Sequence, residues 1–253
     1  MHELSWPRRL ELGARAGVVG GVASSLLLWL LVEPAISRAI LLEEAGRRGH
    51  HEGSTDHEHA EIVTRLQQQI GGTIAVVVVA LLLGVAFAVT YARVSQRLPG
   101  STDLGRSLSL AGMAFTILAV APALAVPANP PGVGRPETVN ERTATYLLVI
   151  VLSTLCVVVV LALHNTMQNS GLPTEQRWLA TSAAVVGGAV IVLVIPHIQE
   201  PIPAGMPADL LWEFRVGSLA QLAGMWATIG VVHGFLVHRT RAQLRARRSV
   251  ATA

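Results

Sequence analysis

Six long hydrophobic runs without acidic or arginine side chains restrict the fold of this chain more than any other feature. They lie at Ala16–Val32, Gly71–Tyr91, Leu108–Val126, Ala144–Leu163, Trp178–Ile195 and Val216–Val237. An α-helix rises 1.5 Å per residue, so each run reaches or approaches the length that crosses about 30 Å of hydrocarbon. Lipid offers the backbone no hydrogen-bond partner, so such runs must be helical. The sequence therefore predicts an all-α integral membrane protein, a single polytopic domain over 1–253 with about six transmembrane helices.

The remaining composition excludes several classes of protein. Charged residues make up 14% of the chain, against about 25% in soluble domains. The 19 basic residues are all arginines, so the lysine of a phosphate-binding loop is missing. A single cysteine, Cys156, permits neither an intramolecular disulfide nor a CxxC metal site. No Ser-His-Asp, HExxH or dinucleotide-binding motif is legible, and we expect no enzyme activity.

The arginines predict the orientation in the membrane. With a cytoplasmic N-terminus, the inside segments would carry 12 arginines and the outside segments 7. Cytoplasmic loops are enriched in basic residues, so we predict a multi-pass plasma-membrane protein with both termini inside. Residues 238–253 would form a basic cytoplasmic tail. Acidic residues show the opposite bias, with 4 inside and 12 outside.

The longest external segment, residues 33–70, predicts a metal-capturing loop. Pro34 suits the first turn of a helix, and Ile36, Ala39 and Ile40 form an apolar stripe, so we expect a short amphipathic helix over Pro34–Ala45 at the outer surface. Four of the nine histidines follow within ten residues. Imidazole and carboxylate suit first-row divalent metals; the candidate ligands are His50, His51, Asp56, His57, Glu58 and His59. The alternative is a solvated polar linker.

A second set of polar residues borders the hydrophobic runs and could line an ion pathway. Ionisable groups at membrane depth are costly and mark functional routes by default. The candidates are Glu33, His197 and Glu200 at the outer boundary, and His164 and His233 near the inner end. Near an interface, a polar side chain can reach water at little cost in free energy. The alternative for each candidate is therefore a residue at the interface without a role in transport. Gln221, inside the last run, is more typical of a hydrogen bond between helices.

Two local patterns predict structure rather than function. Gly13, Gly17, Gly21 and Ser25 recur every four residues, and Ala80, Gly84 and Ala88 repeat that spacing in the second run. Such faces let helix backbones approach closely. Thr138 and Glu141 fit a capping box that would open the fourth helix.

Several segments, in order along nearly the whole chain, resemble the CbtA family of membrane proteins. They are Glu33-Pro34 with Glu43-Glu44, the His-rich loop, Arg65–Gln68, Asn129–Gly134 with Pro136–Thr138, and Pro203–Trp212 with Phe214-Arg215. The resemblance implies a probable cobalt transporter subunit linked to cobalamin synthesis. It also implies a partner, the small His-tailed membrane protein CbtB. The spacing of the ligands alone names no metal.

We therefore expect a permease subunit that takes up a divalent metal, with Co²⁺ favoured and Ni²⁺ as the second candidate. The metal is cargo, and no permanently bound cofactor is expected. Membrane lipid and a CbtB-like subunit are the expected partners, nucleic acid is not, and assembly with further copies of the chain is left open. The alternative function is a non-conducting scaffold or sensor that binds metal for a partner.

Overall fold

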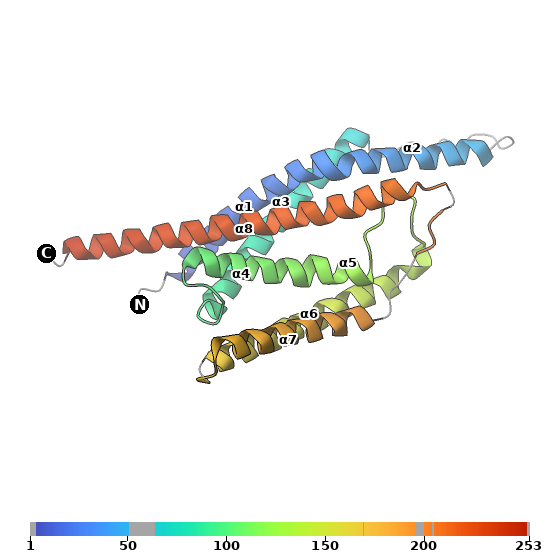
Figure 1. The fold of residues 1–253 in the computed structure, drawn as a ribbon. Coiled ribbons are helices and arrows are strands. Elements are labelled where there is room, and N and C mark those ends of the chain that lie inside the picture. Colours follow the sequence, from blue (N-terminus) through green and yellow to red (C-terminus); the bar gives the residue numbers. More distant parts are fainter. Residues whose placement is uncertain (1–3, 51–63, 169, 196–199, 204, 252–253) are drawn as a thin grey trace.

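The computed structural model describes residues 4–50, 64–168, 170–195, 200–203 and 205–251. Figure 1 shows long helices running roughly along one direction, with the N-terminal end of α1 and the C-terminal end of α8 at the same end of the bundle. The helices are α1 (Trp6–Leu27), α2 (Glu33–His50), α3 (Arg65–Val94), α4 (Asp103–Phe115), α5 (Ala121–Ala125), α6 (Val139–Gln168), α7 (Thr174–Val194) and α8 (Ala208–Ala251). Short π or 3-10 turns lie at Leu28–Val32, Thr116–Val120 and Pro136–Thr138.

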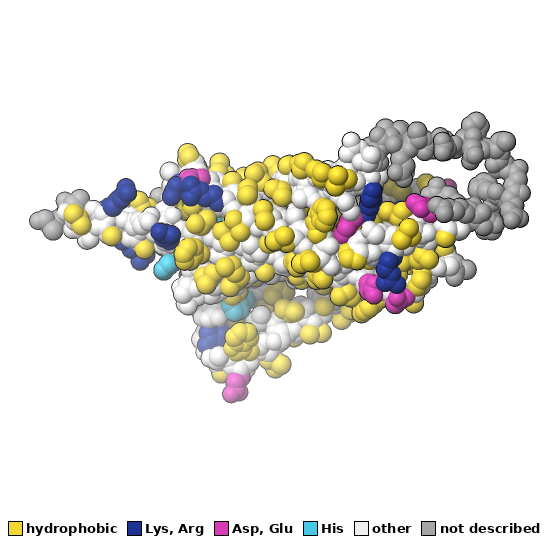
Figure 2. Space-filling view, turned by 90° about the horizontal axis from the view of Figure 1, so that it is seen from above, with side chains coloured by type: hydrophobic (Ala, Val, Ile, Leu, Met, Phe, Trp, Pro, Cys, Tyr) yellow, Lys and Arg dark blue, Asp and Glu magenta, His cyan; other side chains and the backbone are white. Residues whose placement is uncertain are grey.

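Six helical stretches are long and apolar enough to cross a membrane, which confirms the predicted fold class. They are Trp6–Ala45, Arg65–Val94, Asp103–Ala125, Pro136–Gln168, Thr174–Val194 and Ala208–Arg247. Figure 2 shows hydrophobic side chains covering the middle of the molecule, whereas arginine and acidic side chains gather toward its two ends. This distribution is the one that a bilayer requires, because the middle of each span faces hydrocarbon.

The helix after Glu33 differs from the prediction in how it is attached. It exists, as α2, but it continues α1 through the π turn instead of lying apart as a separate surface helix. Its apolar stripe packs on α8, where Ala35, Ala39 and Leu210 form a small buried cluster. Arg38 strengthens this contact through ion pairs with Asp209 and Glu213.

Proline accounts both for the π turns and for the difference between the predicted and the observed start of this helix. Proline cannot donate a hydrogen bond to the carbonyl four residues earlier, so an interior proline strains an α-helix. The wider π turn accommodates the ring without ending the helix. Each π turn ends two residues before a proline, one at Val32 before Pro34 and the other at Val120 before Pro122. The sequence predicts Pro34 at the start of a helix, whereas in a membrane span proline is tolerated inside one.

The predicted small-residue faces of α1 and α3 both lie at a close helix contact, and the structure shows that they pack against each other. A Cβ atom added at Gly21 would lie 2.8 Å from Cα of Val77, and one added at Gly13 would lie 2.5 Å from the carbonyl oxygen of Gly84. The same positions are buried in both helices. Only glycine permits this backbone approach, so the pattern fixes α1 against α3.

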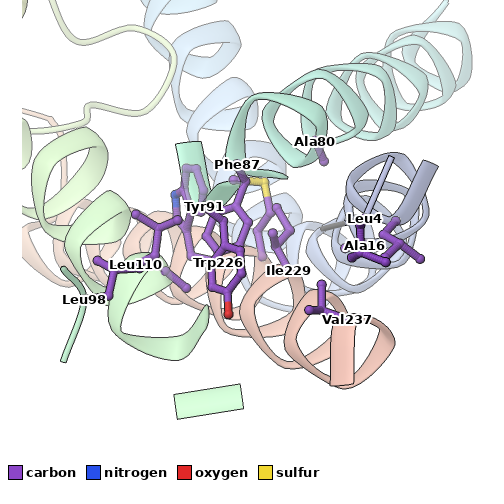
Figure 3. Packing of buried hydrophobic residues seen from close by; sticks show 13 residues of the cluster. Leu4, Ala16, Ala80, Phe87, Tyr91, Leu98, Leu110, Trp226, Ile229 and Val237 are labelled. Atoms are coloured by element: carbon purple, nitrogen blue, oxygen red, sulfur yellow. The ribbon is translucent and has the colours of Figure 1, made fainter. Parts of the chain in front are cut away.

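Helix α8 completes the main core. It packs against α1 and α4, and its Met225, Trp226 and Ile229 are buried with Phe87 and Leu110. Figure 3 shows these aromatic and aliphatic side chains meeting between the helices. Helices α1, α3, α4 and α8 thus form one packed unit, called the main block below.

Helices α6 and α7 form a separate hairpin that leans on α5 and the π turn before it. Their contacts are mainly with each other, and Figure 1 shows the pair set apart from α1 and α3. Most side chains of these two spans are not covered by the rest of the protein, as Leu179 and Val194 on α7 illustrate. Their apolar surface suits lipid contact.

Candidate ion-handling groups at the two ends of the bundle

The predicted metal ligands fall almost entirely outside the described residues. His51, Asp56, His57, Glu58 and His59 belong to the undescribed segment 51–63, and His50 is the last residue of α2, with its side chain undescribed. In the sequence the segment joins α2 to α3, and α2 ends at the end of the bundle opposite the chain termini (Figure 1). Helix α3 begins with a capping box in which the Thr64 hydroxyl accepts from the Gln67 amide.

Glu33 lies beside α3 rather than beside α7. Its carboxylate pairs with the Arg65 guanidinium and accepts a hydrogen bond of 2.8 Å from Gln69. An outer mouth built from Glu33 and Glu200 would require the first and fifth spans to adjoin. Helix α1 instead packs on α3 and α8, while α7 packs on α6 and α5. The structure therefore does not bring these two acidic groups together through adjacent helices.

Glu200 is held in a basic clamp at the start of α6. Its side chain is 2% exposed and forms ion pairs with Arg135 and Arg142. The Arg135 amide donates to it at 3.1 Å, and the Thr138 hydroxyl donates as well. The hydrogen bond from Thr138, then the amide of Arg135 and the two guanidinium charges, hold the pKa of the Glu200 carboxyl below its usual value.

This clamp corrects the predicted capping box. The Thr138 hydroxyl donates to Glu200 and to the Arg135 carbonyl instead of capping α6 together with Glu141. A hydrogen bond from the Thr138 hydroxyl to a charged carboxylate is stronger than one between that hydroxyl and a neutral backbone amide of α6. His197, the predicted candidate three residues before Glu200, lies outside the described residues.

His164 lies at the other end of the hairpin, close to the turn between α6 and α7. Its Nε2 is 3.3 Å from Nε2 of Gln168. A cavity of about 210 Å³ lies beside it, lined also by Thr174, Arg177 and Trp178. The cationic Arg177 makes this a poor resting place for a dication.

His233 is the most enclosed of the candidates, 2% exposed. Its Nδ1 lies 3.2 Å from the Ser107 hydroxyl. The ring meets Phe87 and Tyr91 edge-on, with centroids 5.1 Å and 4.9 Å apart. Each of these contacts can be explained by packing between helices, without a role for His233 in binding an ion.

A cavity of about 550 Å³ opens next to His233, at the end of the bundle that carries the chain termini. At its wall, Asp103 accepts from the Tyr91 hydroxyl at 3.2 Å and pairs with Arg241. Arg9, Arg106 and Arg245 also line it. We call it the arginine cavity.

An apolar layer separates the arginine cavity from the next polar pair. Gln221 donates to the Ser24 hydroxyl at 3.2 Å, which confirms its predicted role between helices. His233 lies twelve residues further along α8, about 18 Å at the helical rise. Phe87, Met225, Trp226 and Ile229 fill the interval and are almost fully buried. The Gln221–Ser24 pair is thus separated from the polar groups around His233.

No cluster of three or more His, Cys, Asp or Glu side chains that could hold a metal occurs within the described part of the chain. Sequence reasoning missed Tyr91, Asp103 and Arg241 as partners around His233. A spacing of four residues could have indicated part of this set, because His233, Val237 and Arg241 follow one another every four residues on α8, and residues four apart are neighbours on one side of a helix.

Comparison with protein-family models matches residues 8–238 to the family described as probable cobalt transporter subunit (CbtA). No curated protein matches the chain, and no solved structure matches it either.

Proposed function

The chain belongs to the CbtA family of probable cobalt transporter subunits, and from this premise we propose that it serves the uptake of a divalent transition metal. Co²⁺ is the favoured cargo, for use in cobalamin synthesis, and Ni²⁺ is the second candidate. The family match, which reaches into all six spans, is the observation that carries this proposal. The protein would lie in the plasma membrane with both termini in the cytoplasm, as the arginine distribution favours.

Metal capture falls to the His-rich segment. The imidazole and carboxylate groups come from His50, His51, His57 and His59, with Asp56 and Glu58. Helix α2 ends at His50, at the end of the bundle opposite the termini (Figure 1). That end also carries the acidic excess of the sequence, which raises the local concentration of cations. Capture by neutral imidazole weakens as pH falls through about 6.5, because protonation removes the metal-binding lone pair.

Entry does not require a nucleotide-binding motif in this chain. A dication that moves toward an inside-negative potential gains about 4.6 kcal/mol per 100 mV, twice the value for one elementary charge. The family name describes a subunit, which supports a partner in the complex. A small His-tailed membrane protein is the partner that we propose.

One observation favours the alternative, a scaffold or sensor that binds metal without conducting it. Glu33 and Glu200 are both neutralised by arginines, and His233 is separated from Gln221 by the apolar layer. A conducting route through the described groups would therefore need those ion pairs to open. Desolvating a dication without replacement ligands costs many kcal/mol.

Metal-dependent uptake into proteoliposomes decides between the two functions. The full chain is reconstituted alone and with a small His-tailed membrane protein, with an imposed inside-negative potential and radioactive Co²⁺. Uptake that rises with the potential supports the permease. Metal binding at the outer segment without uptake in either preparation would leave only the scaffold.

Two variants separate capture from conduction in the same assay. Replacing His50, His51, His57 and His59 with alanine should raise the half-saturating metal concentration and leave the maximal rate nearly intact, because a capture loop forms no barrier. Glu33→Gln or His197→Ala should lower the maximal rate even at saturating metal if these groups border the route. Unchanged maximal rates in both would make them structural.

A further inference from the structure

Among the described residues, the arginine cavity is lined by more arginines than acidic side chains. Arg9, Arg106, Arg241 and Arg245 line it, against Asp103 as the acidic residue of its wall. Asp103 is already paired with Arg241. Such a concave, cationic site repels a dication and attracts an anion.

Two of these arginines are available to a ligand. Arg106 is half-buried, and its Nε donates at 3.0 Å to the carbonyl oxygen of Gly100, an uncharged partner. Arg106 has no ion pair with a described carboxylate, and Arg245 has neither a hydrogen bond nor an ion pair within the described part of the chain. Arginine presents a planar fork of donors that fits the oxygens of a phosphate group.

The depth and position of the cavity fit the same ligand. Its volume of about 550 Å³ falls within the usual range for small-ligand sites. Tyr91, Ser95 and Thr102 add hydroxyl groups to the wall. Trp6, 48% exposed, lies at this end under the guanidinium groups of Arg9 and Arg93. An exposed tryptophan beside arginines is typical of the headgroup level of a membrane.

From this arrangement we propose that the arginine cavity binds the phosphate group of an anionic ligand, with Arg106 and Arg245 as its direct contacts. The phosphate belongs either to the headgroup of an anionic lipid or to a small soluble phosphate. The site and the C-terminal end of α2 lie at opposite ends of the bundle (Figure 1), and the proposal is independent of metal transport.

Native mass spectrometry of the full chain in detergent tests the proposal. One arm adds phosphatidylglycerol, a second adds phosphatidylcholine, and a third adds inorganic phosphate to lipid-free protein. Binding of phosphatidylglycerol over phosphatidylcholine identifies a lipid headgroup. Binding of inorganic phosphate with no preference between the lipids identifies the soluble source. Absence of binding in all three arms overturns the proposal.

A charge-matched pair of variants locates the site. The double variant Arg106→Gln/Arg245→Gln removes two charges from the cavity, and Arg239→Gln/Arg247→Gln removes two from the same end of α8, outside it. Each arginine near an anionic group contributes about 1 kcal/mol, so the cavity variant should bind about 25-fold more weakly. The control should bind nearly as well as the wild-type chain. An equal loss in both would mean a diffuse charge effect and would overturn the site.

A folding defect is kept separate by the single variant Arg245→Gln. This side chain is exposed and makes no contact that holds the fold, so the variant should fold normally and still lose about fivefold in affinity. Wild-type affinity in this variant, with loss only in a misfolded double variant, would contradict the proposal.

Discussion

The main block and the α6–α7 hairpin solve the same problem of crossing a membrane in different ways. In the most apolar stretches, 39% of the residues of α8 are buried inside the protein, but only 6% of those of α7. The block is held by backbone contact at glycines and by a dense core. The hairpin is attached through α5 and a few polar contacts. The difference shows that helix formation in lipid and helix packing are separate requirements.

The polar contacts of the hairpin can be named. The Tyr146 hydroxyl donates to the Leu118 carbonyl at 3.1 Å, and the Asn165 amide donates to the Arg97 carbonyl at the same distance. Leu118 is four residues before Pro122, so its carbonyl lacks the donor that an ordinary helix would supply. Pro122 of α5 thus creates the acceptor to which the hairpin binds. Between the two units, an almost wholly apolar groove of about 510 Å³ remains.

The largest expected difference between the two units comes from a matched glycine substitution. Gly84→Leu would drive a side chain into backbone atoms of Gly13 and Gly17, whereas at Gly187 on α7 no heavy atom lies within 4 Å of an added Cβ. Overpacking against immovable backbone should cost at least about 3 kcal/mol in the block. Gly187→Leu should be neutral or stabilising by up to about 1 kcal/mol, because glycine is a poor helix former.

Unfolding of the purified variants in detergent, followed by circular dichroism, measures this contrast. Equal losses of stability in Gly84→Leu and Gly187→Leu would show that the hairpin is packed as tightly as the block. The proposed difference in packing between the main block and the hairpin would then be wrong.

The two histidines give the second contrast. His233→Ala removes the hydrogen bond to Ser107 and two edge-on aromatic contacts, and should lower stability by about 2 kcal/mol. His164→Ala on the hairpin loses a contact with Gln168 at the surface and should cost less than about 0.5 kcal/mol. Thermal unfolding in detergent measures both. A larger cost for His164 would mean that the hairpin turn carries structure that its exposure does not show.

The sequence predicted those parts of the fold that depend on one helix or on a regular spacing. The six spans followed from length, and a four-residue period identified the small-residue faces of α1 and α3, although it did not show that they meet. The capping of α6 could not be predicted, because Glu200, which takes the Thr138 hydroxyl, is distant in the chain. Likewise the neutralisation of Glu33 depends on Arg65, which is 32 residues further along the chain. The arginine cavity is lined by residues from α1, α3, α4 and α8, and a local sequence pattern does not show which distant residues lie close together.

The third prediction concerns the hydrogen bond created by Pro122. Tyr146→Phe removes only the hydroxyl that donates to Leu118, so it leaves a carbonyl unpaired and should weaken the docking of the hairpin by about 1 kcal/mol. Hydrogen exchange should rise in α6 and remain unchanged in α1 and α3. A rise of equal size in all helices would mean that the two units unfold as one.

The smallest effect, and the one that depends on pH, should come from the clamp around Glu200. The folded-state pKa of this carboxyl is lowered, so its contribution to stability is fully present above the unfolded value of about 4.3 and is lost as pH falls through the folded value. Glu200→Gln removes the charge that holds Arg135 and Arg142, although its amide oxygen can still accept from Thr138.

Hydrogen exchange of residues 135–145, compared at pH 7 and pH 3 after correction for the intrinsic rate, tests this sign. In the wild-type chain, protection of the segment should drop toward acid, because protonation releases both arginines. In Glu200→Gln, protection should be lower than wild type at pH 7 and nearly independent of pH. The main block should show no such difference between the two chains, because Glu200 contacts the start of α6 and not α1 or α3. An identical acid response in both chains would assign the change to other carboxylates, and the clamp would no longer explain how the ends of the hairpin are held.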